Sequence, residues 1–169
     1  TGGWNKMVDA AFPGRQNHAA VEFNNRLYVI GGCDDIQCYN DVWWSADRLV
    51  WQRETTVGTI FSPRGDHALA AYRGRLWLYG GRSPAESDRS YELWSSADGI
   101  TWRPEPAAQG WYWYYYSTFI VSGELLVLQS DTYTYGTLDG VRWGNFGYMS
   151  SGACTTGTVG WVKAGSPSS

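Results

Sequence analysis

Short apolar runs alternate with polar turns along the chain. A run at 19–24 is followed by a polar turn and by a second run at 26–32, which ends in two glycines. The same order returns at 68–72 and 75–81. Runs of this length, bounded by turn residues, are typical of buried strands and are much shorter than the ~20 residues that cross a bilayer. The pattern predicts an all-β chain without a membrane span.

The runs belong to a repeated unit. A matching tetrapeptide stands before each first run and ends at His18 and at His67, which lie 49 residues apart. Adding 49 again places 124–130 on the second strand of a third unit, where Gln129 and Ser130 replace the glycine pair. Because a fixed period indicates repeated supersecondary units, the copies predict three equivalent pieces of structure.

Tryptophans and tight turns mark the back half of each unit. Trp51, Trp102 and Trp143 recur at spacings of 51 and 41 residues, so the third unit is about ten residues shorter in its middle loop. Asp-Gly pairs at 98–99 and 139–140 are strong turn signals between antiparallel strands. Each unit is therefore predicted to hold four short strands. In the first unit they are placed near 17–23, 26–32, 40–46 and 50–53.

This repeat resembles that of the kelch-repeat β-propeller family. The glycine pair, the downstream tryptophan and the period near 50 residues agree with that family over roughly residues 13–145. The resemblance implies an all-β, kelch-like β-propeller with four-stranded antiparallel blades. The single domain, 1–169, is expected to divide into a partial blade strand at 1–12, blades at 13–55, 56–106 and 107–146, and a partial blade at 147–169.

The number of blades bears on how the fold closes. Known rings have four to eight blades, so three copies are expected to leave the propeller incomplete in one chain. Either the chain is part of a longer propeller, or two copies self-associate to complete one ring. An open strand edge has to be covered in both cases, and two-fold assembly is the commonest oligomeric arrangement.

Charge and cysteine content limit which partners and which cellular compartment suit the chain. The net charge is −3 and the only lysines are Lys6 and Lys163, so the basic cluster that nucleic acid requires is missing. Cys33 and Cys38 lie five residues apart, whereas Cys154 stands alone. A Cys33–Cys38 disulfide would suit an extracellular or periplasmic protein. Two free thiols are the alternative.

The sequence shows no catalytic or metal-binding motif. It contains no Ser-His-Asp triad, phosphate loop or zinc spacing, and we expect no cofactor. The only histidines, His18 and His67, share one repeat position, which favours anchoring of the first strand over a metal or acid–base pair. The Arg-Gly-Asp tripeptide at 64–66 falls inside the repeat signature, so chance explains it.

By resemblance to the family, two sets of loops form the ligand face. One set leads into the first strand of each blade, and the other joins the second strand to the third. Together they carry arginine, carboxylate and aromatic groups, and the arginine fork suits a carboxylate on a ligand. The expected ligand-binding residues are Arg15, Asn17, Asp34, Arg64, Asp66, Arg82, Trp113, Tyr115 and Asp131.

Six consecutive aromatic residues at 111–116 lead into the third unit. Flat rings suit stacking on a sugar ring or a peptide side chain, and packing between blades or against another chain is the alternative. The expected function is therefore non-enzymatic recognition of a protein or a carbohydrate ligand. A sugar-active enzyme of the kelch type and a structural assembly subunit stay open, because the fold alone does not choose among them.

Overall fold

A computed structural model describes residues 9–82, 91–105, 117–130 and 133–148. The regular secondary structure of these residues consists of twelve strands. Within the same ranges no helix has the length and apolar character needed to cross a membrane. Several sequence expectations fall outside the described residues: the aromatic run with Trp113 and Tyr115, Asp131, Cys154, and most of the partial blades at 1–12 and 147–169.

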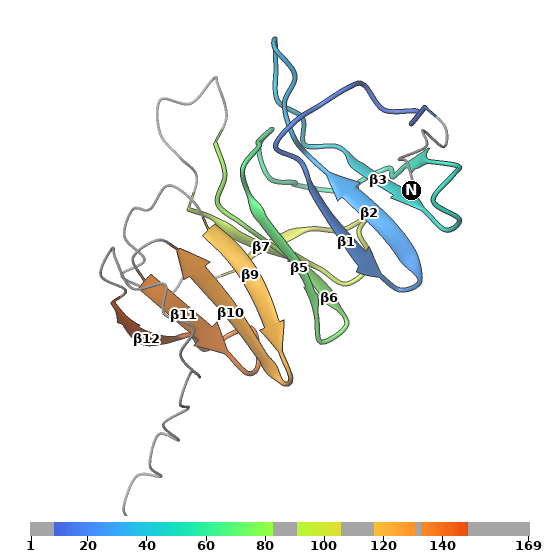
Figure 1. The fold of residues 1–169 in the computed structure, drawn as a ribbon. Coiled ribbons are helices and arrows are strands. Elements are labelled where there is room, and N and C mark those ends of the chain that lie inside the picture. The colour runs from blue at the N-terminus through green and yellow to red at the C-terminus, as the bar shows by residue number, and fades with distance from the viewer. Residues whose placement is uncertain (1–8, 83–90, 106–116, 131–132, 149–169) are drawn as a thin grey trace, which may run out of the picture.

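The strands form three four-stranded antiparallel sheets, each built from consecutive strands (Figure 1). Blade 1 contains β1 (Ala19–Phe23), β2 (Arg26–Ile30), β3 (Val42–Ser45) and β4 (Gln52–Arg53). Blade 2 contains β5 (Ala68–Tyr72), β6 (Arg75–Tyr79), β7 (Leu93–Ser96) and β8 (Arg103–Glu105). Blade 3 contains β9 (Ser117–Ser122), β10 (Leu125–Ser130), β11 (Tyr133–Thr137) and β12 (Gly144–Tyr148). The predicted fold, an incomplete propeller of four-stranded blades, is confirmed.

The hairpin turns follow from local sequence. Asn24 and Asn25, between β1 and β2, have φ values of 48° and 58°. Arg73 and Gly74, between β5 and β6, have φ values of 47° and 68°. Two consecutive left-handed residues give a two-residue hairpin whose twist matches that of the strands. Asparagine and glycine tolerate this conformation best, so the turn sequence fixes the pairing of the first two strands.

The hydrophobic core lies between the blades. The first strands β1, β5 and β9 lie side by side, so neighbouring sheets face one another (Figure 1). Burying apolar faces between blades is what holds such a repeat together. The seam between blades 1 and 2 contains Phe23, Tyr28, Ile30, Val42, Phe61, Leu76, Leu78, Trp94 and Trp102. The seam between blades 2 and 3 contains Ala68, Ala70, Tyr72, Trp77, Tyr79, Leu93, Leu126 and Leu128.

The third copy lies one residue later than a constant period of 49 predicts. The hairpin pair Tyr72–Arg75 of blade 2 corresponds to Ser122–Leu125 of blade 3, 50 residues on. The predicted offset was therefore wrong by one residue. A strand alternates its faces, so only the observed register turns Leu126 into the seam, as Leu76 is turned in blade 2.

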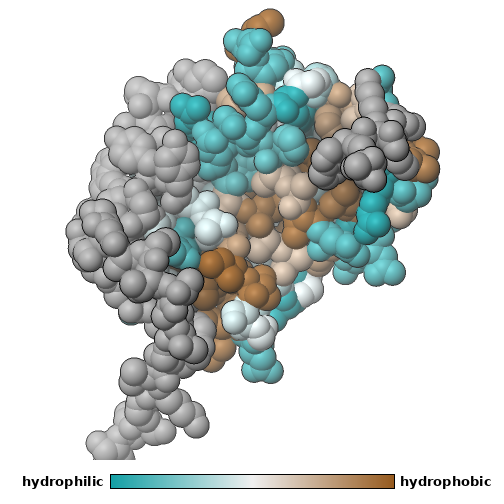
Figure 2. All heavy atoms as spheres, viewed as in Figure 1, coloured by the Kyte–Doolittle hydropathy of each residue, from teal (hydrophilic) through white to brown (hydrophobic). Residues whose placement is uncertain are grey.

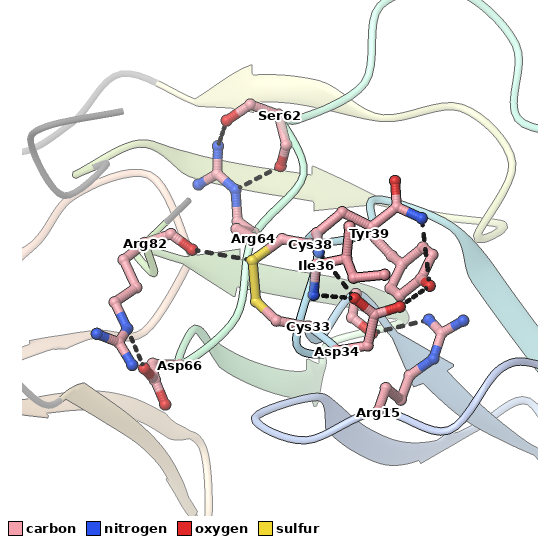
Figure 3. Close-up of a disulfide and its surroundings, with 12 residues drawn as sticks. Arg15, Cys33, Asp34, Ile36, Cys38, Tyr39, Ser62, Arg64, Asp66 and Arg82 are labelled. Atoms are coloured by element: carbon pink, nitrogen blue, oxygen red, sulfur yellow. Dashed lines mark hydrogen bonds and ion pairs between the residues drawn. A yellow bond between two sulfur atoms is a disulfide. The ribbon is translucent and has the colours of Figure 1, made fainter. Parts of the chain in front are cut away.

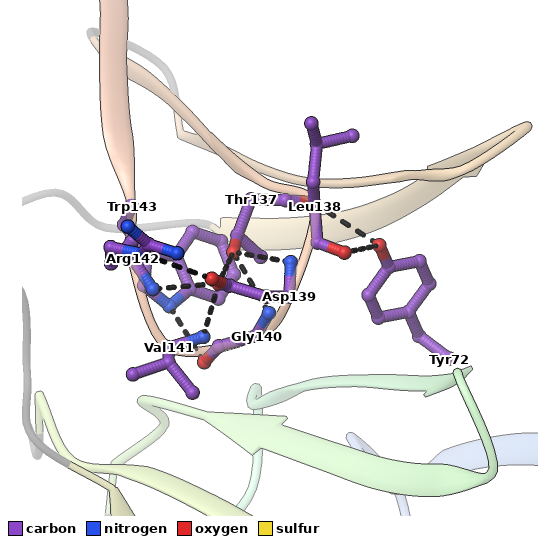
Figure 4. Close-up of polar contacts among 8 residues, drawn as sticks. All are labelled: Tyr72, Thr137, Leu138, Asp139, Gly140, Val141, Arg142 and Trp143. Carbon is purple, nitrogen blue, oxygen red and sulfur yellow. Dashed lines mark hydrogen bonds and ion pairs between the residues drawn. The ribbon is translucent and has the colours of Figure 1, made fainter.

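One aspartate caps the turn between the third and fourth strands of each blade. Asp139 Oδ1 accepts hydrogen bonds from the backbone N–H groups of Arg142 (2.8 Å) and Val141 (2.9 Å), as Figure 4 shows. These backbone hydrogen bonds hold the pKa of Asp139 well below its usual range. Asp47 and Asp98 make the equivalent bonds. The turn that the sequence predicted from Asp-Gly pairs is thus stabilised by the aspartate carboxylate.

Candidate functional site

The predicted ligand loops meet at one end of blades 1 and 2, which we call the rim and define as residues 15–18, 31–38, 64–67 and 80–82. Backbone bridges join the segment before each first strand to the segment after each second strand. Gln16 N–H donates to the Cys33 carbonyl (2.8 Å), and Gly65 N–H donates to the Arg82 carbonyl (2.9 Å). The rim is therefore a repeated backbone arrangement.

Two predicted ligand residues of the rim point inward. The side chains of Arg15 and Arg64 are each only 1% exposed. Arg15 donates to the Asp41 carboxylate (2.5 Å) and to the Gly31 carbonyl (2.9 Å). In blade 2, Arg64 donates to the Glu92 carboxylate (2.8 Å) and to the carbonyl of Gly80, the residue after β6 (2.8 Å). Each guanidinium thus ties the glycine pair to the third strand of its own blade.

Three other predicted residues surround the outer side of the rim. Asp66 and Arg82 form an ion pair (2.7 Å), and the Arg82 side chain is 58% exposed (Figure 3). The backbone N–H of Asp66 donates to the carbonyl of Asn17 (2.9 Å), which joins blade 2 to blade 1. Asn17 and Asp66 share a left-handed φ, 58° and 57°. The exposed charge of Arg82 and its half-buried partner therefore lie on a tightly held backbone.

A disulfide joins Cys33 to Cys38 and closes a short loop next to the ion pair (Figure 3). Within that loop Asp34 Oδ1 accepts hydrogen bonds from the N–H groups of Ile36 (2.8 Å) and Gln37 (2.7 Å). Ile36 itself is 88% exposed. Figure 2 shows that this end of the molecule, uppermost in the view, is largely hydrophilic. The loop therefore holds one apolar side chain above a polar surface.

Asp34 also binds the side chain that follows the loop. The Tyr39 hydroxyl donates to Asp34 Oδ2 (2.5 Å), and this bond, followed by the backbone N–H groups of Gln37 and Ile36, lowers the pKa of the Asp34 carboxyl. The same bond raises the pKa of the Tyr39 hydroxyl. The Arg15 guanidinium lies over the Tyr39 ring, 4.3 Å from its centroid. The loop is thus tied to the buried arginine beneath it.

Sequence reasoning missed the acidic partners of the two arginines. Asp41 and Glu92 begin the third-strand segments of their blades and lie 51 residues apart, as Trp51 and Trp102 do. An arginine and a carboxylate that recur together in successive repeats are the signal that could have revealed the pairing. Among the described residues no group of three His, Cys, Asp or Glu side chains is arranged to hold a metal ion.

Comparison with known proteins identifies the repeat. The KLHDC2/KLHL20/DRC7 Kelch-repeats domain matches residues 3–129. The chain belongs to the kelch-repeat family. Curated relatives resemble parts of it. They include the flagellar outer arm dynein alpha chain of Chlamydomonas reinhardtii, which is 32% identical over 59% of this chain and 2% of its own length.

Two further relatives match shorter parts of the chain. Beta-scruin of Limulus polyphemus is 29% identical over 40% of this chain and 8% of its own length. Dynein regulatory complex subunit 7 of Chlamydomonas reinhardtii is 36% identical over 42% of this chain and 6% of its own length. The kelch chain therefore spans only a small part of each of these relatives, and the likeness concerns the repeats.

Proposed function

We propose that this kelch chain recognises a protein ligand through the rim. The observation that carries the proposal is the exposure of Arg82 and Ile36 on a backbone that a disulfide and repeated hydrogen bonds hold in place. Groups that are already ordered lose little freedom on binding, so they can contribute more of their contact energy to affinity. The relatives named as a dynein chain and a dynein regulatory complex subunit support a protein-interaction or structural role.

The predicted site residues divide into two roles in this proposal. Asn17, Asp34, Asp66 and Arg82 contact the ligand, because they lie at the outer side of the rim. The two buried arginines, Arg15 and Arg64, hold the loops in shape through Asp41 and Glu92. Trp113, Tyr115 and Asp131 stay in the proposed ligand face on the sequence argument alone.

A peptide display library screened against the immobilised chain tests the proposal. Arg82→Ala should weaken binding of a selected peptide by about 1.5–3 kcal/mol, the range for hydrogen bonds to charged groups. Arg103→Ala is the matched control, because Arg103 is also exposed and paired with a carboxylate, Glu105, but lies on β8. Equal losses of affinity in both variants would refute recognition at the rim. So would selected peptides that bind both variants as tightly as they bind the wild-type chain.

A glycan array run beside the peptide screen decides the ligand class. A carbohydrate ligand would give glycan signals that Arg82→Ala abolishes, together with an empty peptide screen. That outcome would keep the rim as the site and change the ligand. If Arg82→Ala leaves both the glycan signals and the binding of the selected peptides unchanged, recognition takes place elsewhere on the chain.

A second candidate function is assembly, and one observation favours it. In blade 2, Phe61 packs edge-on against Trp102, with ring centroids 5.1 Å apart, and both are buried against blade 1. In blade 1, Phe12 and Trp51 repeat that geometry at 5.2 Å but are only half-buried. We propose that this face of blade 1 packs against a second copy. Light scattering tests it: a monomer at all concentrations would exclude self-association.

A further inference from the structure

His67 occupies an unusual place in the seam between blades 1 and 2. It lies directly before β5, is only 7% exposed, and its ring packs against Gly31 of blade 1. A Cβ built on Gly31 would lie 2.9 Å from His67 Cε1, so the two blades touch closely at this point. Among the described residues neither ring nitrogen of His67 has a hydrogen-bond partner. A buried imidazole without a partner is costly even when neutral.

The charged groups around His67 offer no compensation for a positive ring. Arg64, on the same segment, and His18, at the start of blade 1, both disfavour the protonated imidazole. The carboxylates of the surrounding segments are already paired: Asp41 with Arg15, Glu92 with Arg64, and Asp66 with Arg82. Burial, followed by the charge of Arg64 and the neighbouring His18 ring, lowers the pKa of His67 to about 3.

We propose that the rim end of the seam between blades 1 and 2 opens more readily in mildly acidic solution, because His67 can take up a proton only when its ring leaves the seam. The backbone hydrogen bonds that would break join the same two blades. They run from the N–H of Asp66 to the Asn17 carbonyl, from the N–H of Gly32 to the Arg64 carbonyl and from the N–H of Arg64 to the Tyr39 carbonyl, each 2.9 Å long. Opening would therefore take the rim apart without unfolding either sheet. The proposal does not depend on what the rim binds.

The direction of the effect follows from proton linkage. The closed seam holds His67 neutral down to about pH 3, whereas the open seam gives it an ordinary pKa near 6.5. Below pH 6.5 the open state binds more protons, so each further pH unit favours opening by about tenfold. Between pH 7.5 and pH 4.5 the opening constant should rise about 100-fold.

Hydrogen exchange of the Gly32 and Asp66 amides, corrected for intrinsic rates, measures this opening. In the wild-type chain we expect a rise of about 100-fold from pH 7.5 to pH 4.5, with little change for amides inside β6. His67→Gln, which cannot gain a charge, should remove the rise, and His67→Leu should do the same. His18→Gln is the control and should retain it, because His18 is exposed.

Two results of the exchange experiment would overturn the proposal. A pH dependence that persists in both His67 variants, or wild-type protection that does not change down to pH 4.5, would show that His67 does not control the seam. If neither variant folds, the imidazole of the wild-type chain can be titrated by NMR. Protonation of His67 near pH 6.5 with both amides still protected would then contradict the proposal.

Discussion

The two seams between blades have the same architecture but different chemistry. In the seam between blades 1 and 2, the residue that ends β1 is Phe23, whose ring lies 6.1 Å from that of Tyr28. In the seam between blades 2 and 3, the equivalent residue is Tyr72, whose hydroxyl reaches the backbone carbonyl of Leu138 (2.9 Å, Figure 4). The same hydroxyl also reaches the backbone carbonyl of Glu124 (2.5 Å). One added hydroxyl thus joins a packed aromatic to the turn of the next blade.

Both seams also share one close contact. Gly99 of blade 2 lies against Tyr28 of blade 1, and Gly140 of blade 3 lies against Trp77 of blade 2. Both glycines have a positive φ, 80° and 79°. Blade 1 has Arg48 at this repeat position, with φ 63° and an exposed side chain. A glycine is therefore needed where the turn meets an aromatic ring of the preceding blade.

The largest expected effect is the loss of stability when the buried tryptophan of one seam is removed, compared with the half-buried tryptophan of the other seam. Trp102→Ala should destabilise the chain by about 3–5 kcal/mol, because Trp102 is 3% exposed and packs edge-on against Phe61. Trp143→Ala, at the same repeat position in blade 3, should cost less, since Trp143 is only half-buried. Denaturant melts measure both. A loss below about 1 kcal/mol for Trp102→Ala, or equal losses in the two variants, would contradict the difference.

The next effect tests the turn contact. Gly140→Ala should cost about 2–4 kcal/mol, because a Cβ there meets the indole of Trp77 and the left-handed backbone adds strain. Gly123→Ala is the control: its φ is also positive, 57°, but nothing lies within 4 Å of the added Cβ. The control should lose only about 1 kcal/mol, from the backbone alone. Similar losses in thermal melts would mean that the ring contact does not matter.

The smallest effect isolates the hydroxyl that distinguishes the seams. Tyr72→Phe should lose about 1 kcal/mol, the usual net value of one hydrogen bond. The reciprocal change, Phe23→Tyr, should not gain stability, because Phe23 is only 5% exposed and an added atom in a packed core costs free energy. Urea melts of both variants measure the pair. A gain in Phe23→Tyr that matches the loss in Tyr72→Phe would show that the two seams are interchangeable.

Much of the fold could be predicted from the sequence because its signals are local. The glycine pairs, the Asp-Gly turns and the recurring tryptophans each act within a few residues, and they correctly predicted four strands in each blade. The register of blade 3 was the exception. Which face of 125–130 meets blade 2 depends on Leu126 and Leu128 packing across the seam, and a constant period does not contain that information.

For the rim, too, the sequence predicted some features and left others to the tertiary structure. The sequence alone determined that Arg15, Arg64, Asp66 and Arg82 lie on the loops at one end of the blades, because the repeat fixes their positions along the strands. Only the tertiary structure decided which arginines turn inward. A guanidinium suits a solvated loop and a buried ion pair equally well until a carboxylate from a distant strand is placed beside it. Glu92 stands next to Arg64, whereas Arg82 meets Asp66 at the surface, and that long-range placement separates the two.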